Sequence, residues 1–416
     1  MSFSIHPWCS VFTLALLLPS AIAADEPIRS GLKLSLGNAG SVVRALNPTL
    51  AAARYQIGEA RGRLRQAGLL SNPEAETSFQ HDPQFREHSA EFGLTQDIPV
   101  TARLRYEKEV SLAELQATEA EVADLERRLI GQVREGLIEL LALRAQKANS
   151  ARQAKVLQEL LTFIASQVTK AEASTLDLNQ LKVERSQLGL AMRRLEVEHT
   201  LALSALKPLL GVPPNKHVVV IDSLPNPDIK YSPAGDEQSR PDIQAAAHLA
   251  EAAEREIQSE RAKRYDDLSV GLFLERALEE DAPKGLERET AIGVRVSFPI
   301  PFWNKNKGAI EEKNAKHLRL AKEKQALESN AAHESAKARL TMQAQQDLLT
   351  EIDNTLAPQA TAQINDLEQA YKKGLSNLQS VLRARRQFIK LGAARIDALR
   401  DYHLARVQLE TSLALP

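Results

Sequence analysis

The side chains that could perform catalysis or hold a metal are scattered along this sequence. It contains nine histidines, and no two of them have metal-ligand spacing on an expected helix face. His81 and His88 bracket a loop between expected strands, and His333-Glu334 lacks the second histidine of a zinc protease motif. Phosphate-binding loops, dinucleotide-binding glycine motifs and nucleophile elbows are absent from the sequence. We therefore expect a protein that is not an enzyme and holds no cofactor or metal.

The more informative polar residues occur at two interruptions of long helical patterns. The first is the segment from Ala171 to Thr175, where Ser174 or Thr175 suits the N-cap of the following helix. The second is the segment from Gly374 to Leu378. Each interruption is short enough to form the tip of a tight helical hairpin. The simplest interpretation is that these residues are turn caps and solvated charges.

The composition favours long helices packed through small side chains. Of the 416 residues, 43% are hydrophobic but only 4% are aromatic. The 53 lysines and arginines nearly balance the 54 aspartates and glutamates, so no overall field would recruit nucleic acid. We expect no nucleic-acid partner.

The N-terminal segment has the pattern of an export signal. An apolar run from Val11 to Leu18 leads to Ala21-Ile22-Ala23, a small-x-small pattern that predicts a signal peptide over residues 1–23. The segment before the run contains His6 but no lysine or arginine. An uncleaved anchor is the alternative, but the run is too short to span a bilayer. Cys9, the only cysteine, would be removed with the signal.

Two pairs of strands alternate with long helical hairpins. Four segments alternate polar and apolar residues with the period of a strand. They are residues 75–81, 89–98, 268–275 and 290–298. The charged segment between the last two is expected to be a loop. Helical periodicity covers residues 101–210 and 304–413, and its first unbroken stretch would extend on the order of 100 Å, which indicates a coiled coil or bundle.

The same order of elements occurs twice along the chain. Residues 24–211 form the first predicted repeat and residues 239–416 the second, separated by a proline-rich linker over residues 212–238. The proline steps at Pro99 and Pro299 occupy corresponding positions at the ends of strands. An internal duplication is therefore predicted.

The strand count predicts assembly from several copies. Four strands are too few for a membrane barrel, which needs about eight. An open sheet cannot lie in lipid, because the polar groups of its edges would be unsatisfied. Three copies would supply twelve strands. The predicted fold class is therefore mainly α with a small β part, a duplicated arrangement in which a homotrimer forms a 12-stranded β-barrel continued by an α-helical barrel.

At these residues the chain resembles the TolC-like outer-membrane factors of tripartite efflux systems and type I secretion. The matching features are Gln66-Ala67-Gly68 with Asn72-Pro73, the helix start at Arg240, the segment from Pro299 to Ile310, and the two hairpin tips. The resemblance covers essentially the whole chain after the predicted signal. It implies a barrel in the outer membrane of a Gram-negative cell, a helical tunnel across the periplasm, and partnership with outer-membrane lipid, a periplasmic adaptor and an inner-membrane pump. The segment PIPFWNKNKGAI looks most like the heavy-metal cation efflux branch.

The resemblance also implies functional residues at the tips. In the family, the hairpin tips line a periplasmic aperture and contact the adaptor. The matching residues are Glu172, Ser174, Leu176, Asp177, Gly374, Ser376, Leu378, Ser380 and Arg383. Because Ser380 and Arg383 stand where the family often carries acids, an all-acid cation-binding ring is not predicted. We hypothesise that Asp177 pairs with Arg383 or Lys373 of a neighbouring hairpin and holds the aperture shut.

The resemblance further implies that Pro99 and Pro299 mark the boundary between barrel and helices. Trp303 follows this boundary and suits an anchor at the membrane interface, although packing at the corner is an equal alternative.

The predicted function is a passive export conduit for small toxic compounds, including heavy-metal cations in the narrower interpretation. The main alternative is a periplasmic coiled-coil adaptor or scaffold without a membrane barrel. An adaptor would need a lipoyl-like β domain, which the sequence does not show, and would not need four lipid-facing strands. A hydrolase on a helical frame would need a polar cluster that is also missing.

Overall fold

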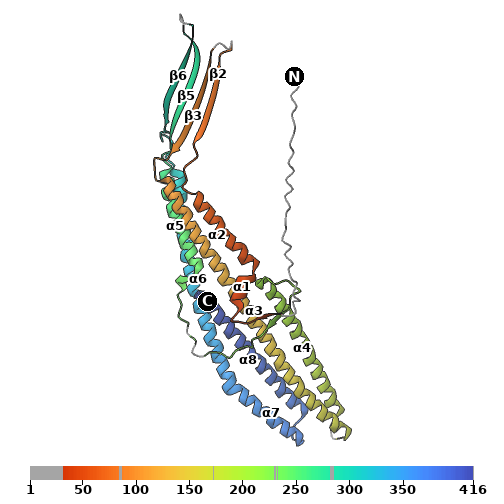
Figure 1. The fold of residues 1–416 in the computed structure, drawn as a ribbon. Helices are drawn as coiled ribbons and strands as arrows, with labels where there is room; N and C mark the ends of the chain where they lie inside the picture. The colour runs from red at the N-terminus through yellow and green to blue at the C-terminus, as the bar shows by residue number, and fades with distance from the viewer. Residues whose placement is uncertain are drawn as a thin grey trace, which may run out of the picture.

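The computed structural model describes residues 31–415, except residues 84–86, 172, 229–230, 232 and 282–284. The predicted signal peptide, residues 1–23 with Cys9, lies outside this part. The molecule is elongated, with a four-stranded sheet at one end and long helices at the other (Figure 1). The chain is mainly α with a small β part, as predicted.

The four-stranded sheet contains both predicted strand pairs. Its strands are β2 (Glu74–His81), β3 (His88–Ile98), β5 (Leu268–Asp281) and β6 (Gly285–Ser297). Their order is β2-β3-β5-β6, and every neighbouring pair is antiparallel. The central pairing of β3 with β5 joins the two halves of the chain, and β2 and β6 are the edge strands.

The second strand pair is longer than the sequence predicted. The charged segment over residues 279–289 was expected to be a loop, but β5 continues to Asp281 and β6 begins at Gly285. Strands are held by backbone hydrogen bonds, so charged side chains are accepted wherever they remain exposed on the surface of the sheet. The expectation of a long loop was therefore wrong, because it relied on polarity alone.

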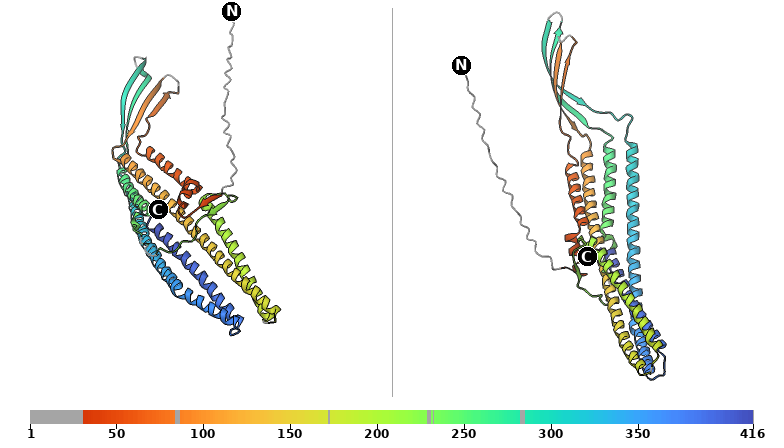
Figure 2. Two further views of the ribbon diagram at one scale, coloured as in Figure 1. Left: turned by 60° about the horizontal axis from the view of Figure 1, so that its bottom comes forward. Right: turned by 90° about the vertical axis from the view of Figure 1, so that its right-hand side faces the viewer.

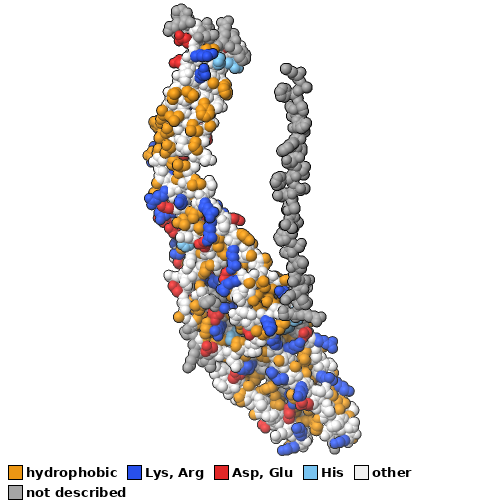
Figure 3. Space-filling view, in the orientation of Figure 1, with side chains coloured by type: hydrophobic (Ala, Val, Ile, Leu, Met, Phe, Trp, Pro, Cys, Tyr) orange, Lys and Arg blue, Asp and Glu red, His pale blue; other side chains and the backbone are white. Residues whose placement is uncertain are grey.

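The two faces of the sheet differ in chemistry. Leu94, Leu272 and Val294 are cross-strand neighbours on one face, and Ile292 on the same face is 82% exposed. On the opposite face, Arg295 forms an ion pair with Glu91, with an N–O distance of 2.7 Å. One side of the sheet is therefore apolar and exposed, and the other side is charged. Hydrophobic side chains cover much of the strands in Figure 3.

Long helices extend from the sheet in two hairpins. The first comprises α3 (Arg103–Thr169) and α4 (Thr175–Leu210), and the second comprises α6 (Lys307–Glu351), α7 (Ala357–Lys372) and α8 (Leu378–Ser412). Shorter helices α1 (Ala39–Leu46), α2 (Pro48–Gln66) and α5 (Pro241–Ala262) accompany them (Figure 2). Within the described part of the chain, the helices lack the combination of length and apolar character that crossing a bilayer requires.

A π-helical turn separates α6 from α7. It covers Ile352–Leu356 and ends two residues before the proline at residue 358. Proline has no N–H to donate to the preceding turn, which accounts for the break in the regular helical hydrogen bonds. Arg395 of α8 fixes the turn by two hydrogen bonds to Asp353, at 2.5 and 2.9 Å.

A small second sheet was not predicted from the sequence. Strand β1 (Leu32–Leu34) pairs in parallel with β4 (Val218–Val220), which lies within the predicted linker. These strands pack against α1, α3 and α4 through buried side chains that include Leu137 and Leu206. The residues of the linker therefore contribute to the core near the middle of the molecule.

Candidate functional site

The two helical hairpins end beside each other, at the end of the molecule opposite the four-stranded sheet (Figures 1 and 2). Ser174 caps α4, because its Oγ accepts a hydrogen bond from the N–H of Leu176 at 3.1 Å. Asn377 caps α8 in the same manner, accepting from the N–H of Ser380 at 2.9 Å. The sequence predicted the first cap but not the second. Each cap fixes where its helix begins and so sets the shape of the tip.

A hydrophobic cluster supports the tips from within. It contains Ile164, Leu181, Leu378 and Leu382, which come from α3, α4 and α8. Leu378 is only 2% exposed, whereas Leu176, its counterpart in the predicted duplication, is 63% exposed. The two leucines therefore have different roles: Leu378 holds the hairpins together, and Leu176 lies on the surface.

A cavity of about 490 Å³ lies between the two tips. It brings together five of the residues assigned by resemblance, namely Ser174, Asp177, Gly374, Ser376 and Leu378. Burial, together with the nearby Asp177 carboxylate, raises the pKa of Tyr371, which also lines the cavity. Ser380 and Arg383 lie on the following turns of α8, outside this lining. Glu172 is outside the described residues.

The charged residues at the tips have no ionic partner within the described part of one chain. Asp177 is half-buried, while Lys373 and Arg383 are exposed, and none of the three forms an ion pair with another described residue. Their charges are therefore available to a neighbouring molecule. The hypothesis that Asp177 pairs with Arg383 or Lys373 of another copy stays a prediction.

Several polar contacts that the sequence did not indicate hold the hairpins in place above the tips. Arg386 of α8 lies 3.6 Å from Glu184 of α4, and Arg385 pairs with Glu368 of α7. Farther from the tips, the side chain of Gln146 in α3 donates a hydrogen bond to Asp397 of α8 at 2.8 Å. These partners are far apart in sequence, so no local pattern could have identified them.

At the other end of the helices, the strand-to-helix boundary is exposed. Pro299 is exposed and Pro99 is half-buried. Trp303 is 91% exposed and Phe302 is 72% exposed, and their rings meet edge to face with centroids 5.2 Å apart. Trp303 is therefore uncovered within one chain. Whether it anchors the membrane interface or packs at the corner against another copy stays a prediction.

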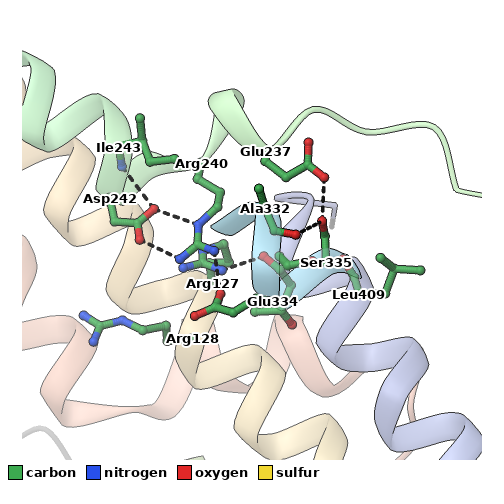
Figure 4. Close-up of polar contacts among 12 residues, drawn as sticks. Arg127, Arg128, Glu237, Arg240, Asp242, Ile243, Ala332, Glu334, Ser335 and Leu409 are labelled. Carbon is green, nitrogen blue, oxygen red and sulfur yellow. Dashed lines mark hydrogen bonds and ion pairs between the residues drawn. The ribbon is translucent and has the colours of Figure 1, made fainter. Parts of the chain in front are cut away.

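A buried polar network crosses the middle of the molecule (Figure 4). The side chain of Arg240, 7% exposed, lies 2.7 Å from both Asp242 and Glu334. Burial alone would raise the pKa of Asp242, but the hydrogen bonds and charge of Arg240 outweigh it and hold the pKa below its ordinary value. Glu237 accepts a hydrogen bond from Ser335 at 2.7 Å. The network fastens the start of α5 to α6 and is structural.

The described residues contain no group of three or more histidine, cysteine, aspartate or glutamate side chains arranged to hold a metal ion. The site at the tips is therefore a surface with a cavity and unpaired charges. Its chemistry suits contact with other molecules.

Known proteins resemble this chain in sequence and in fold. Residues 237–415 match the family model described as outer membrane efflux protein. The cobalt-zinc-cadmium resistance protein CzcC of Cupriavidus metallidurans is 22% identical over 285 residues, which cover 67% of this chain and 65% of that relative. The chain thus spans just under two thirds of that relative's length.

Solved structures share the fold. A structure of CusC superposes with a TM-score of 0.76 at 19% identity and covers 92% of both chains. The outer-membrane channel OprN gives a TM-score of 0.77 at 17% identity, covering 92% of this chain and 90% of OprN. VceC of Vibrio cholerae gives 0.73 at 18% identity, covering 91% of this chain and 95% of VceC. Residues 237–415 are therefore similar in sequence to the outer membrane efflux protein family, and the chain shares the fold of these solved channels.

Proposed function

We propose that this chain is the outer-membrane channel of a tripartite efflux system and acts as a passive conduit. The observation that carries the proposal is the four-stranded sheet, which has one exposed apolar face and two open edges. Such a face is stable in lipid, but the edges are not, because their backbone groups would lack hydrogen-bond partners there. Pairing the β2 edge of one copy with the β6 edge of the next removes both edges.

A homotrimer closes this arrangement with twelve strands, which lies within the range of membrane barrels. The helices continue from the sheet and would form the wall of a tunnel in the periplasm. A soluble adaptor or scaffold has no need of an exposed apolar sheet face, so this feature argues against the alternative. The division into repeats at residues 24–211 and 239–416 belongs to the same proposal.

The hairpin tips are the proposed aperture and adaptor contact. Their cavity, their exposed Leu176 and their unpaired Asp177 and Arg383 all lie at the end that faces away from the sheet. A periplasmic adaptor would bind this end and connect it to an inner-membrane pump that supplies the energy. Asp177 would pair with Arg383 or Lys373 of the next copy when the aperture is closed.

Heavy-metal cations are the proposed cargo. The support is the relative named as a cobalt-zinc-cadmium resistance protein, together with the segment from Pro299 to Ile310. Deleting the gene should lower the tolerance of the host to zinc, cobalt or cadmium, and a plasmid copy should restore it. Lost tolerance to organic compounds alone would reject the metal cargo without affecting the conduit.

The conduit itself is tested with the purified protein. We expect it to require detergent for extraction, to have the mass of a trimer by native mass spectrometry, and to conduct ions in planar bilayers. Recovery as a monomer in the soluble periplasmic fraction would contradict the proposal and favour the scaffold.

A further inference from the structure

The apolar face of the sheet ends in a group of basic residues at the end farthest from the helices. In one row of cross-strand neighbours, Phe79, Ala90, Arg276 and Thr290 lie on this face. In the next row, His81, His88, Leu278 and Arg288 lie on it. Lysine or arginine and histidine side chains gather at this end of the strands in Figure 3, beyond the hydrophobic band.

Arg276 and Arg288 are close to each other. Arg276 lies directly opposite Thr290, and Arg288 is two residues away from Thr290 on the same strand. Such diagonal neighbours are about 7–8 Å apart in an antiparallel pair. Two guanidinium groups at this separation can both reach one phosphate group, and each can donate two parallel hydrogen bonds to it.

Neither arginine has an acidic partner among the described residues. Both are exposed, and neither takes part in an ion pair or side-chain hydrogen bond within the described part of the chain. Arg295 on the opposite face behaves differently, since it pairs with Glu91 at 2.7 Å and lies 3.9 Å from Glu76. Arg276 and Arg288 on the apolar face therefore lack acidic partners among the residues that the structure describes, whereas Arg295 on the opposite face has them.

Three acidic residues at this level lie on the face opposite the arginine pair. Glu275, Glu287 and Glu289 are adjacent in sequence to the outward-facing residues and, by strand alternation, lie on the opposite face. Asp82 and Glu87 lie at the end of the β2–β3 hairpin, where the N–H of Glu87 donates to Asp82 Oδ1 at 2.9 Å. The arginine pair thus faces outward with an apolar band directly below it.

We propose that Arg276 and Arg288 bind the phosphate groups of an outer-leaflet lipid whose acyl chains lie against the apolar face. The ligand class is a phosphorylated lipid, because the arginine pair provides for phosphate and the adjoining band, which includes Phe79 and Ile292, provides for acyl chains. His88, which lies opposite Leu278 and diagonally from Arg276, adds ring nitrogen atoms beside the pair. The inference rests on the proposed function, since it requires that the sheet lies in the outer membrane.

The test uses the full-length trimer and bisphosphorylated lipid A as the probe. Native mass spectrometry in detergent counts bound lipid A in comparison with phosphatidylcholine. We expect wild type to prefer lipid A, and R276Q/R288Q to bind it roughly thirtyfold more weakly, because a basic residue near an anionic surface contributes about 1 kcal/mol. The Lys variant R276K/R288K keeps both charges but loses the paired hydrogen bonds, so its affinity should be intermediate.

The matched control is R185Q/R193Q, which removes two exposed arginines of α4 that also lack ion-pair partners among the described residues. This variant should bind lipid A as wild type does. Equal affinity of R276Q/R288Q and wild type would overturn the inference, and so would equal binding of lipid A and phosphatidylcholine. Displacement of lipid A by an equal concentration of inorganic phosphate would overturn it as well, because the site would then hold a free anion. If the mass recorded before lipid is added shows no trimer, both this inference and the proposed function fail.

Discussion

Among the carboxylates of the helical region, Glu135 has a pKa that burial raises. Glu135 of α3 lines a cavity of about 310 Å³ near the middle of the molecule, together with Arg128 and Gln408. Burial raises the pKa of Glu135, and the hydrogen bond with Gln408 offsets only part of this effect. A carboxylate with a raised pKa in the folded state opposes folding once it is ionised.

Glu135→Gln should therefore stabilise the protein at neutral pH. The stability that the wild-type side chain contributes to the folded state is fully present below its unfolded pKa, near 4.5. This stability is lost as the pH rises through the higher pKa of the folded state. We expect the variant to have the higher Tm at pH 7, and the difference to disappear below pH 4.5. Thermal unfolding in detergent across this range measures it. A difference that is the same at all pH values would show that the charge of Glu135 is not its cause.

The tip residue Asp177 provides a second prediction at this scale. Asp177→Ala should raise the conductance of the closed channel in planar bilayers, because the proposed pair with Arg383 or Lys373 of the next copy is lost. An exposed pair contributes up to about 1 kcal/mol, so open probability should rise about twofold to fivefold for each pair. The charge-swapped variant D177R/R383D should restore closure if Arg383 is the partner. The control is Asp347→Ala, which removes an exposed carboxylate of α6. An unchanged closed state in Asp177→Ala would contradict the hypothesis.

At the scale of helices and strands, local patterns predicted most of the fold. The long helices and the four strands of the main sheet follow from periodicity, which a short window of sequence contains. Strand β1 was missed because its partner β4 lies far along the chain, in the predicted linker. Likewise, the sequence equated Leu176 with Leu378, yet helices from elsewhere cover only Leu378. What the sequence could not supply was the identity of distant neighbours, including the Glu334 partner of Arg240.

One glycine within α4 and one directly after it test how the end of this helix is fixed. Gly211 ends the helix with φ +67°, and a Cβ atom there would lie 2.1 Å from the carbonyl oxygen of Leu46. Gly211→Ala should therefore destabilise the protein by at least about 2 kcal/mol, from backbone strain and the clash. Gly189→Ala has no atom within 4 Å of its new Cβ and should stabilise the helix by about 0.5–1 kcal/mol. Denaturant unfolding measures both, and equal stabilities would contradict this account of the helix end.

At the scale of the whole molecule, the proposed function places the apolar face of the sheet in lipid. Ile292→Arg places a charge on that face and should reduce the membrane-inserted fraction, at a cost of about 2–4 kcal/mol near the bilayer midplane. Ala291→Arg makes the same change one residue earlier, on the charged face opposite Glu275, and should be tolerated. Resistance to carbonate extraction reports insertion. If both variants insert equally, the apolar face is not the face in contact with lipid.

The pairing of β3 with β5 has a consequence for the order of folding. All of α3, α4 and the linker separate these two strands along the chain, so their contact requires closure of a very long loop. Local helical contacts form quickly, whereas distant strand pairing is slow. We expect the helices to form first and the central strand pair last. Under the proposed function, the chain would then cross the periplasm before its lipid-facing surface is complete, which limits the time during which that surface could aggregate.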